Sequence, residues 1–312
     1  MTLTGLRNGT LKLIIFGGKG GVGKTTCAAS TGIYLSRYFK TLLFSTDPAH
    51  SLSDSLDQQI GEETTEVKGV DNLSALEVSS EKALLKFKGK YGEDIKKILD
   101  TATYLDQSDI DSVFSLQIPG IDEVMGFKTI VDLMEEGKYD KYILDTAPTG
   151  HALRLLTLPG LLDEWIKVVA KMRWKYRYMI QSFAGKYQPD KADDFLIEMK
   201  KTVKRIEGLL RDSEKCEFIA VTIPEAMAIL ETERLINTLN SYGIRVRQLV
   251  INNVMESGGC RFCRERKNGQ EKHIEEIRRK FGGLKLTIVP LQPREVKGIE
   301  SLHKFQHLFC EN

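Results

Sequence analysis

Two lysines and a threonine lie within one glycine-rich segment near the start of the chain, residues 17–26. Counted from Gly18 to Thr25, the segment fits the phosphate-loop pattern G-x-x-x-x-G-K-[ST]. In this pattern loop N–H groups hold phosphate oxygens, Lys24 neutralises the β- and γ-phosphates, and the Thr25 hydroxyl binds Mg²⁺. The residues expected to contact a nucleotide are Gly18, Lys19, Gly20, Gly21, Val22, Gly23, Lys24, Thr25 and Thr26.

The residues on either side of this segment support the interpretation. A short apolar run at 11–16 has the character of a strand, and residues 27–35 form a plausible helix start. A phosphate loop lies between a strand and a helix, where the helix N-terminus attracts anions. The alternative is a glycine-rich turn that binds nothing. It does not explain why the glycine-rich segment lies between a strand-like run and a helix start, as a phosphate loop does.

Two aspartates follow strand-like runs further along the chain. Asp47 follows residues 41–45, and Asp145 follows residues 141–144. Ligands of parallel α/β sheets bind beyond the carboxyl ends of the strands, so both carboxylates are expected near the phosphate loop. Asp47 is suited to orient the attacking water or accept its proton, and helix capping before Pro48 is the alternative. Asp145 is suited to hold Mg²⁺ directly or through water.

A C-x₂-C pair, Cys260 and Cys263, is the second pattern with site-forming spacing. Structural zinc takes four ligands, and the remaining three of the five cysteines are isolated in the sequence. A homodimer that shares one Zn²⁺, with two cysteines from each copy, satisfies this count. A shared [4Fe–4S] cluster and a redox disulfide are the alternatives.

The composition narrows the class of protein. The 312 residues are 41% hydrophobic and 28% charged with a net charge of +2, which is ordinary for a soluble protein and indicates no nucleic-acid partner. The sequence shows no signal segment and no apolar run that could span a membrane. An odd, sparse set of cysteines favours a reducing compartment, so a cytoplasmic location is expected.

Short β-rich runs alternate with helical stretches along the chain. This alternation predicts an α/β fold with a doubly wound, mainly parallel sheet of the phosphate-loop NTPase type. The expected strands are residues 12–16, 41–45, 73–78, 141–144, 217–223, 248–252 and 286–289. Residues 80–136 and 151–212 carry helical periodicity without a clear strand. We therefore expect one nucleotide-binding domain over residues 1–312, with a helical subdomain inserted by these two intervals.

The helical intervals are rich in methionine and tryptophan. Five of the eight methionines and both tryptophans lie there. Flexible, polarizable methionines suit surfaces that accept varied apolar partners. On composition alone ordinary core packing is the favoured interpretation, and a basic helix on a membrane surface is a further alternative. Met125, Trp165, Met172 and Met179 become candidates for a client-binding groove only through the family resemblance described below.

With its second lysine, Lys19, the loop resembles the signature of the deviant phosphate-loop ATPases, K-G-G-x-G-K-[ST]. That resemblance implies ATP held between two subunits, with Lys19 reaching the partner's phosphate. A solvated loop charge is the alternative for Lys19. The motifs at 47–50 and 145–151 resemble more specifically the arsenical-pump-driving ATPase family, whose eukaryotic and archaeal branch targets tail-anchored membrane proteins. The likeness covers nearly the whole chain, and Ser51 departs from the asparagine of many members.

This resemblance implies roles for single residues. Asp47 matches the water-activating aspartate, with Lys24 and Lys19 as the other catalytic residues, and Asn252 matches the asparagine that reads adenine. Further nucleotide contacts are implied for Glu225 and for the loop at 290–295, namely Pro290, Leu291 and Gln292. The family also implies zinc shared through the C-x₂-C cysteines, and two helical subdomains that form a groove for a transmembrane segment.

Two functions from different classes follow. The first is an ATP-hydrolysing homodimeric targeting factor that binds the transmembrane segment of tail-anchored proteins and delivers them to a membrane receptor, with ATP, Mg²⁺ and Zn²⁺. The alternative is the arsenite-translocating ATPase subunit of a pump, or an iron–sulfur scaffold ATPase. Pump ATPases hold arsenite with three convergent thiolates, whereas Cys27, Cys216 and Cys310 lie in unrelated segments. Bacterial pumps join two such halves, so this single half is expected to pair with itself.

Overall fold

The computed structural model describes residues 3–47, 51–79, 121–146, 191–256 and 259–310, together with isolated helical positions between 82 and 178. The chain divides into two compact units. The first comprises Met1–Ser79, Leu133–Leu153 and Leu209–Asn312, and the second comprises Ser80–Asp132 and Arg154–Gly208.

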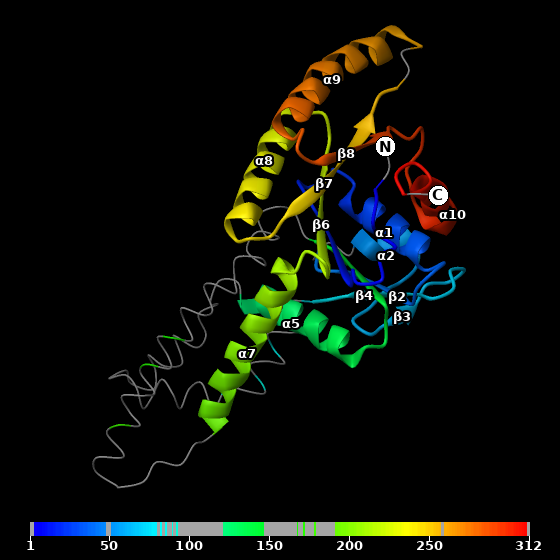
Figure 1. Ribbon diagram of the computed structural model, residues 1–312. Helices are drawn as coiled ribbons and strands as arrows, with labels where there is room; N and C mark the ends of the chain where they lie inside the picture. Colours follow the sequence, from blue (N-terminus) through cyan, green and yellow to red (C-terminus); the bar gives the residue numbers. More distant parts are fainter. Residues whose placement is uncertain are drawn as a thin grey trace, which may run out of the picture. The chain divides into compact units, whose positions relative to one another are not determined.

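An eight-stranded sheet forms the centre of the first unit (Figure 1). Its strands are β1 (Leu13–Gly17), β2 (Thr41–Ser45), β3 (Thr65–Glu66), β4 (Leu73–Glu77), β5 (Lys141–Asp145), β6 (Cys216–Thr222), β7 (Val246–Val254) and β8 (Lys285–Pro290). The order across the sheet is β3-β4-β2-β5-β1-β6-β7-β8, and every pair is parallel except β3 with β4. The predicted α/β fold with a mainly parallel sheet is confirmed.

The seven expected strands all occur, with ends that differ by at most two residues. The sequence missed β3, whose two residues are too few to show an apolar pattern. Strands β1, β2, β5 and β6 are buried at every position, which explains their continuous apolar character.

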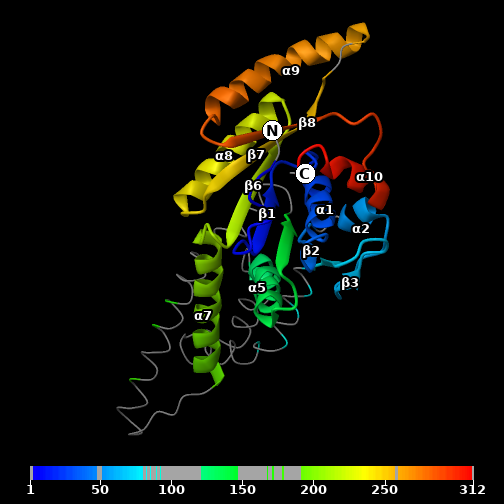
Figure 2. The ribbon, with the colours of Figure 1, turned by 45° about the vertical axis from the view of Figure 1, so that its right-hand side comes forward.

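Helices cover both faces of this sheet (Figures 1 and 2). On one face lie α1 (Lys24–Leu35), α2 (Ser51–Leu56) and α10 (Gly298–Gln306), which contact one another. On the other face α8 (Ala226–Ser241) contacts β6 and β7, and α9 (Arg261–Lys280) contacts α8. The main apolar core lies between the sheet and α1, with α10 packed against α1. Because β1 is central, the loop that follows it lies at the middle of the sheet's carboxyl edge.

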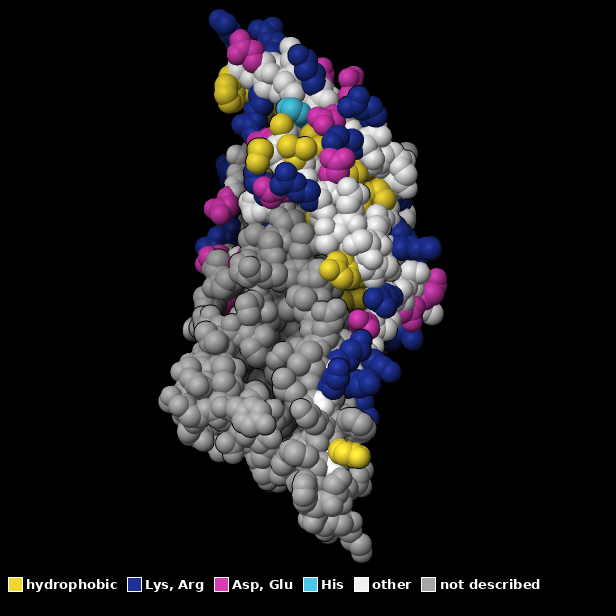
Figure 3. All heavy atoms as spheres, turned by 90° about the vertical axis from the view of Figure 1, so that its left-hand side faces the viewer, with side chains coloured by type: hydrophobic (Ala, Val, Ile, Leu, Met, Phe, Trp, Pro, Cys, Tyr) yellow, Lys and Arg dark blue, Asp and Glu magenta, His cyan; other side chains and the backbone are white. Residues whose placement is uncertain are grey.

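The described part of the second unit comes mainly from two helices, α5 (Ile121–Glu136) and α7 (Lys191–Arg211), both of which continue into the first unit. Helix α7 buries a stripe of apolar side chains, Met199, Val203 and Ile206. Its exposed side is basic (Figure 3, dark blue), with Lys200, Lys201, Lys204 and Arg205.

The client-groove candidates fall largely outside this description. Trp165, Met172 and Met179 lie outside the described residues, as does the side chain of Met125. The inserted subdomain and its groove therefore stay predictions. Within the described ranges, no helix has both the length and the apolar character that a bilayer crossing requires.

Candidate functional site

The glycine-rich loop connects β1 to α1, and two of its glycines are required by the local geometry. Gly23 has φ +93°, and a Cβ there would collide with the side-chain amide of Asn252. Gly18 approaches the backbone of β6 so closely that a Cβ would collide with the Val221 carbonyl. Only glycine fits both positions, so the loop stays close to β6 and β7.

Lys24 opens α1 and is only 5% exposed. Its Nζ donates a hydrogen bond to the Lys19 carbonyl oxygen at 3.2 Å, so its head group points back along the loop. Burial lowers the pKa of Lys24, while the charges of Asp145 and Asp47 raise it. A cation held in this way can neutralise the phosphates of a nucleotide bound by the loop.

Asp145 ends β5 and is fully buried beside this loop. Its Oδ2 accepts hydrogen bonds from Thr25 Oγ1 at 2.8 Å and from Ser45 Oγ at 3.3 Å. Burial raises the pKa of Asp145 to about 7, although the hydrogen bond from Thr25 and the charge of Lys24 both act to lower it. Among the described residues its Oδ1 finds no hydrogen-bond partner.

A buried carboxylate oxygen without a partner, next to a threonine hydroxyl, fits a divalent cation. Mg²⁺ prefers oxygen ligands and usually keeps several waters, so one carboxylate and one hydroxyl form a plausible set. Ser51 Oγ of α2 lies 3.3 Å from Thr25 Oγ1 and adds a third oxygen nearby. The residues present therefore fit magnesium at this edge of the sheet.

Asp47 lies just beyond β2, on the same edge. Its backbone N–H donates to Ser45 Oγ at 3.1 Å, and Ser45 also donates to Asp145. The charge of Asp47 reaches both Lys24 and Asp145, since it raises the pKa of each. The structure thus brings the two predicted aspartates and Lys24 together, as expected from their positions at strand ends.

An open pocket of about 550 Å³ lies alongside the loop. Its walls come from the loop, α2, β7, the segment after β8 and α10. The lining residues are Gly21, Gly23, Thr25, Thr26, Ser51, Asp54, Ser55, Asn252, Asn253, Leu291, Gln292, Pro293, Arg294, Glu295, Val296, Lys297 and Phe305. Seven predicted nucleotide contacts line it, and so does Asp54, whose sequence position is compatible with holding Mg²⁺ through water or with capping a turn, whereas the sequence did not indicate Ser55, Val296 or Lys297. These residues belong to no sequence motif that includes the loop, and only the folding of the chain brings them to the same pocket.

Asn252 is 4% exposed and has a fixed orientation. Its Nδ2 donates to the Val22 carbonyl oxygen at 2.9 Å, so Oδ1 is left as an acceptor. This Oδ1 is buried and has no hydrogen-bond partner within the described part of the chain. An acceptor at the pocket wall is suited to the exocyclic amino group of adenine.

The seven predicted contacts that do not line the pocket are Gly18, Gly20, Val22 and Lys24 of the loop, and Lys19, Glu225 and Pro290. Glu225 is exposed at the N-cap of α8 and is not part of the pocket lining. Lys19 Nζ lies 3.9 Å from Glu231 Oε1 on α8, outside the pocket. Pro290 ends β8, and its carbonyl accepts a hydrogen bond from Gln292 Nε2 at 2.8 Å.

The C-x₂-C pair lies at the start of α9, and its two sulfurs are 3.2 Å apart. Cys260 is the exposed N-cap residue, and its Sγ accepts a hydrogen bond from the Cys263 N–H at 3.3 Å. The hydrogen bond from the Cys263 backbone lowers the pKa of the Cys260 thiol, and the bond to Cys260 raises that of Cys263.

Within the described part of the chain, the surroundings of the pair do not complete a metal site. Over the described ranges, no group of three or more His, Cys, Asp or Glu side chains converges as metal ligands. The remaining cysteines, Cys27, Cys216 and Cys310, are buried. The pair can thus offer two thiolates to one ion.

Comparison with known proteins agrees with this geometry. The family described as "Anion-transporting ATPase" matches residues 11–311. The chain is 36% identical to ATPase ASNA1 homolog 1 of Paramecium tetraurelia, over 98% of this chain and 94% of the relative. It is also 36% identical to ATPase GET3 of Phaeosphaeria nodorum, over 95% of this chain and 93% of the relative.

Proposed function

This chain belongs to the anion-transporting ATPase family, and from that premise we propose that it is a homodimeric targeting factor. It would bind the hydrophobic transmembrane segment of tail-anchored proteins and deliver them to a membrane receptor, using ATP hydrolysis. The observation that carries the proposal is the match to ATPase GET3, which extends over nearly the whole of both chains. A member of this ATPase family uses ATP with Mg²⁺, and the pocket beside the phosphate loop is suited to both.

The hydrolytic step assigns a role to each side chain at the strand ends. Lys24 and the loop N–H groups would hold the β- and γ-phosphates, and Thr25 and Asp145 would hold Mg²⁺. When bound there, magnesium would supply positive charge that offsets the charge of the phosphates. Asp47 would orient the attacking water, and the contact of its N–H with Ser45 holds it at this edge of the sheet.

Pairing of two copies would complete the nucleotide site. In the single chain Lys19 lies beside Glu231, and in a closed pair it would turn to the partner's phosphate. The two thiols at the start of α9 fit half of a four-thiolate zinc site, with the other half from a second copy. Zinc would act there as a structural crosslink, and Arg261, Arg264, Arg266 and Lys267 would offset its thiolate charge.

The client site is proposed from the helical insertion. A transmembrane helix of about 20 residues is about 30 Å long, so two apolar subdomains side by side could cover it. The methionine and tryptophan content of the insertion supports such a surface. Burial of the apolar surface of the segment would stabilise the complex by on the order of 25 cal/mol per Å² of surface removed from water.

The pump alternative receives little support from the cysteines. Three convergent thiolates are needed for arsenite, and the described residues bring no such trio together as metal ligands. Among the described cysteines, Cys260 and Cys263 at α9 have sulfurs 3.2 Å apart and are exposed and partly exposed, whereas the other three are buried.

Co-expression with a tagged transmembrane segment tests the proposal. The expected result is a complex that co-purifies in the presence of ATP, with an ATPase rate that arsenite does not change. A segment in which three leucines are replaced by aspartate is the matched control, and should not be captured. Stimulation of the ATPase by arsenite, with no capture of the segment, would favour the pump function instead.

A further inference from the structure

A buried carboxylate, Glu77, lies next to the nucleotide site but belongs to none of its predicted motifs. It is the last residue of β4 and is 5% exposed. Parallel pairing places Glu77 opposite Ser45 of β2, and Ser45 opposite Asp145 of β5. One row across three strands therefore contains Glu77, the serine that contacts Asp47, and the proposed magnesium ligand.

The Glu77 carboxylate contacts Ser53 of helix α2. Its Oε1 accepts hydrogen bonds from the Ser53 N–H at 2.9 Å and from Ser53 Oγ at 3.1 Å. Ser53 Oγ also accepts a hydrogen bond from the Ile60 N–H at 3.1 Å. Through these hydrogen bonds, Ser53 connects α2 to the last residue of β4 and to Ile60 in the segment that follows the helix.

Helix α2 depends on such contacts for its position. It has six residues, too few for a helix to persist by its own backbone hydrogen bonds. Leu52 and Leu56 anchor its apolar side, because both are buried in the core. Apolar contacts are non-directional, so they fix the depth of the helix better than its rotation. The two hydrogen bonds to Glu77 supply the direction.

The opposite side of α2 forms part of the site. Ser51, Asp54 and Ser55 line the pocket, and Ser51 Oγ lies 3.3 Å from Thr25 Oγ1. A rotation of the helix would therefore move one oxygen of the magnesium surroundings.

We propose that Glu77 is a positioning residue for hydrolysis, which through Ser53 holds α2 in register with the phosphate loop. The inference rests on the proposed role of Asp47 and of this pocket in hydrolysis. Glu77 acts through Ser53 on the α2 wall of the pocket, which carries Ser51.

Steady-state ATPase kinetics of Glu77→Ala and Glu77→Gln test this assignment. Loss of both hydrogen bonds in Glu77→Ala should lower kcat about tenfold, whereas KM for ATP should stay within about threefold because the loop and the base site are untouched. The glutamine oxygen can still accept from the Ser53 N–H, so Glu77→Gln should keep kcat within about threefold of the parent. Rescue by the glutamine separates positioning from a need for the negative charge.

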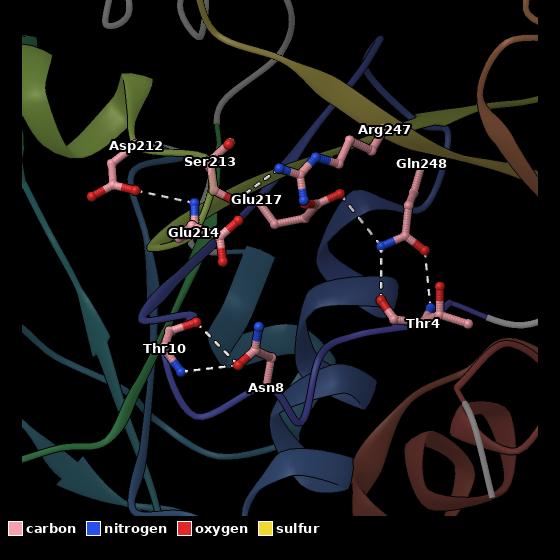
Figure 4. A network of polar contacts seen from close by, with 9 residues as sticks. All are labelled: Thr4, Asn8, Thr10, Asp212, Ser213, Glu214, Glu217, Arg247 and Gln248. Atoms are coloured by element: carbon pink, nitrogen blue, oxygen red, sulfur yellow. Dashed lines mark hydrogen bonds and ion pairs between the residues drawn. The ribbon is translucent and has the colours of Figure 1, made fainter.

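Glu217 provides a matched control at the amino end of the sheet (Figure 4). It is 6% exposed, and its carboxylate lies 3.4 Å from Gln248 Nε2 and 3.8 Å from Arg247 Nη1. Glu217→Ala also removes a buried, hydrogen-bonded carboxylate, but it lies far from α2. It should lower the melting temperature and leave kcat unchanged.

A parental kcat in Glu77→Ala would overturn the inference, and so would an equal loss of kcat in Glu217→Ala. If Glu77→Ala fails to fold, Ser53→Ala removes the hydroxyl and keeps the N–H. It should lower kcat about threefold, and an unchanged kcat would contradict the proposal. Asp47→Asn is measured in the same assay. A parental kcat in Asp47→Asn would refute the proposed role of Asp47 itself. A lowered kcat in Asp47→Asn together with a parental kcat in Glu77→Ala would refute only the positioning role of Glu77.

Discussion

Replacing Asn252 by alanine should remove most of the preference of this site for adenine over guanine. The buried Oδ1 of Asn252 has no partner among the described residues, so a hydrogen bond from an adenine amino group would satisfy it. Such a bond contributes about 1.5 kcal/mol, which corresponds to roughly a tenfold increase in Kd for ATP when it is lost. Guanine presents a carbonyl oxygen instead, so Asn252→Ala should not weaken GTP binding.

The same substitution also removes the donor to the Val22 carbonyl at 2.9 Å. That loss affects the protein with and without nucleotide, so it should lower the melting temperature without contributing to the change in Kd. Competition against a fluorescent ATP analogue, with ATP and GTP as competitors, measures both affinities. Thermal unfolding of the nucleotide-free protein measures the stability separately.

Asn253 is the matched control, because it lines the same pocket with the same type of side chain. Its φ of +57° is readily adopted by glycine, so Asn253→Gly removes the amide without backbone strain. ATP affinity in this variant should stay within about threefold of the parent, since no contact to the base is assigned to it. An equal weakening of ATP and GTP binding in Asn252→Ala would refute the assignment of Asn252 as the base-reading residue.

Three further predictions concern hydrolysis, metal and pH. Asp47→Asn should bind ATP nearly as the parent does and hydrolyse it about 10²-fold more slowly, measured by phosphate release; a parental rate would exclude the proposed role. Metal analysis should find about half an equivalent of zinc per chain, and Cys260→Ser with Cys263→Ser should lose the zinc and weaken the dimer, whereas a monomer that retains a full equivalent would contradict the shared site. Burial lowers the pKa of Lys141 from 10.5 to about 8, so the folded state disfavours its charged form. The free energy of unfolding, relative to Lys141→Met, should therefore rise as pH goes from about 8 to about 10 and stay level below pH 8, and a fall over this window would refute the assignment.

Local patterns were sufficient to predict the parallel sheet and the loop. Continuous apolar strands such as β1 and β5 show their burial directly, and the G-x-x-x-x-G-K-T segment needs its glycines for reasons that backbone geometry makes general. The proximity of Asp47 and Asp145 could also be predicted, because each follows a strand and the carboxyl ends of parallel strands lie at the same edge of the sheet.

Contacts that depend on tertiary packing could not be predicted in this way. Nothing in the residues around Glu77 indicates that its carboxylate meets Ser53, since that contact depends on how α2 folds back onto β4. Lys297 comes to the pocket wall because α10 packs against α1, a long-range consequence of the core. Lys19 was interpreted as reaching across a dimer, and its proximity to Glu231 in one chain had no sequence signal.

Native mass spectrometry of a complex purified through a tagged transmembrane segment tests the central claim most directly. In the presence of Mg²⁺ and ATP, with Asp47→Asn used to slow hydrolysis, the account predicts one species with two copies of the chain, one segment and one zinc ion. Recovery of the segment bound to a single copy, or of a two-copy protein that never carries the segment, would contradict it.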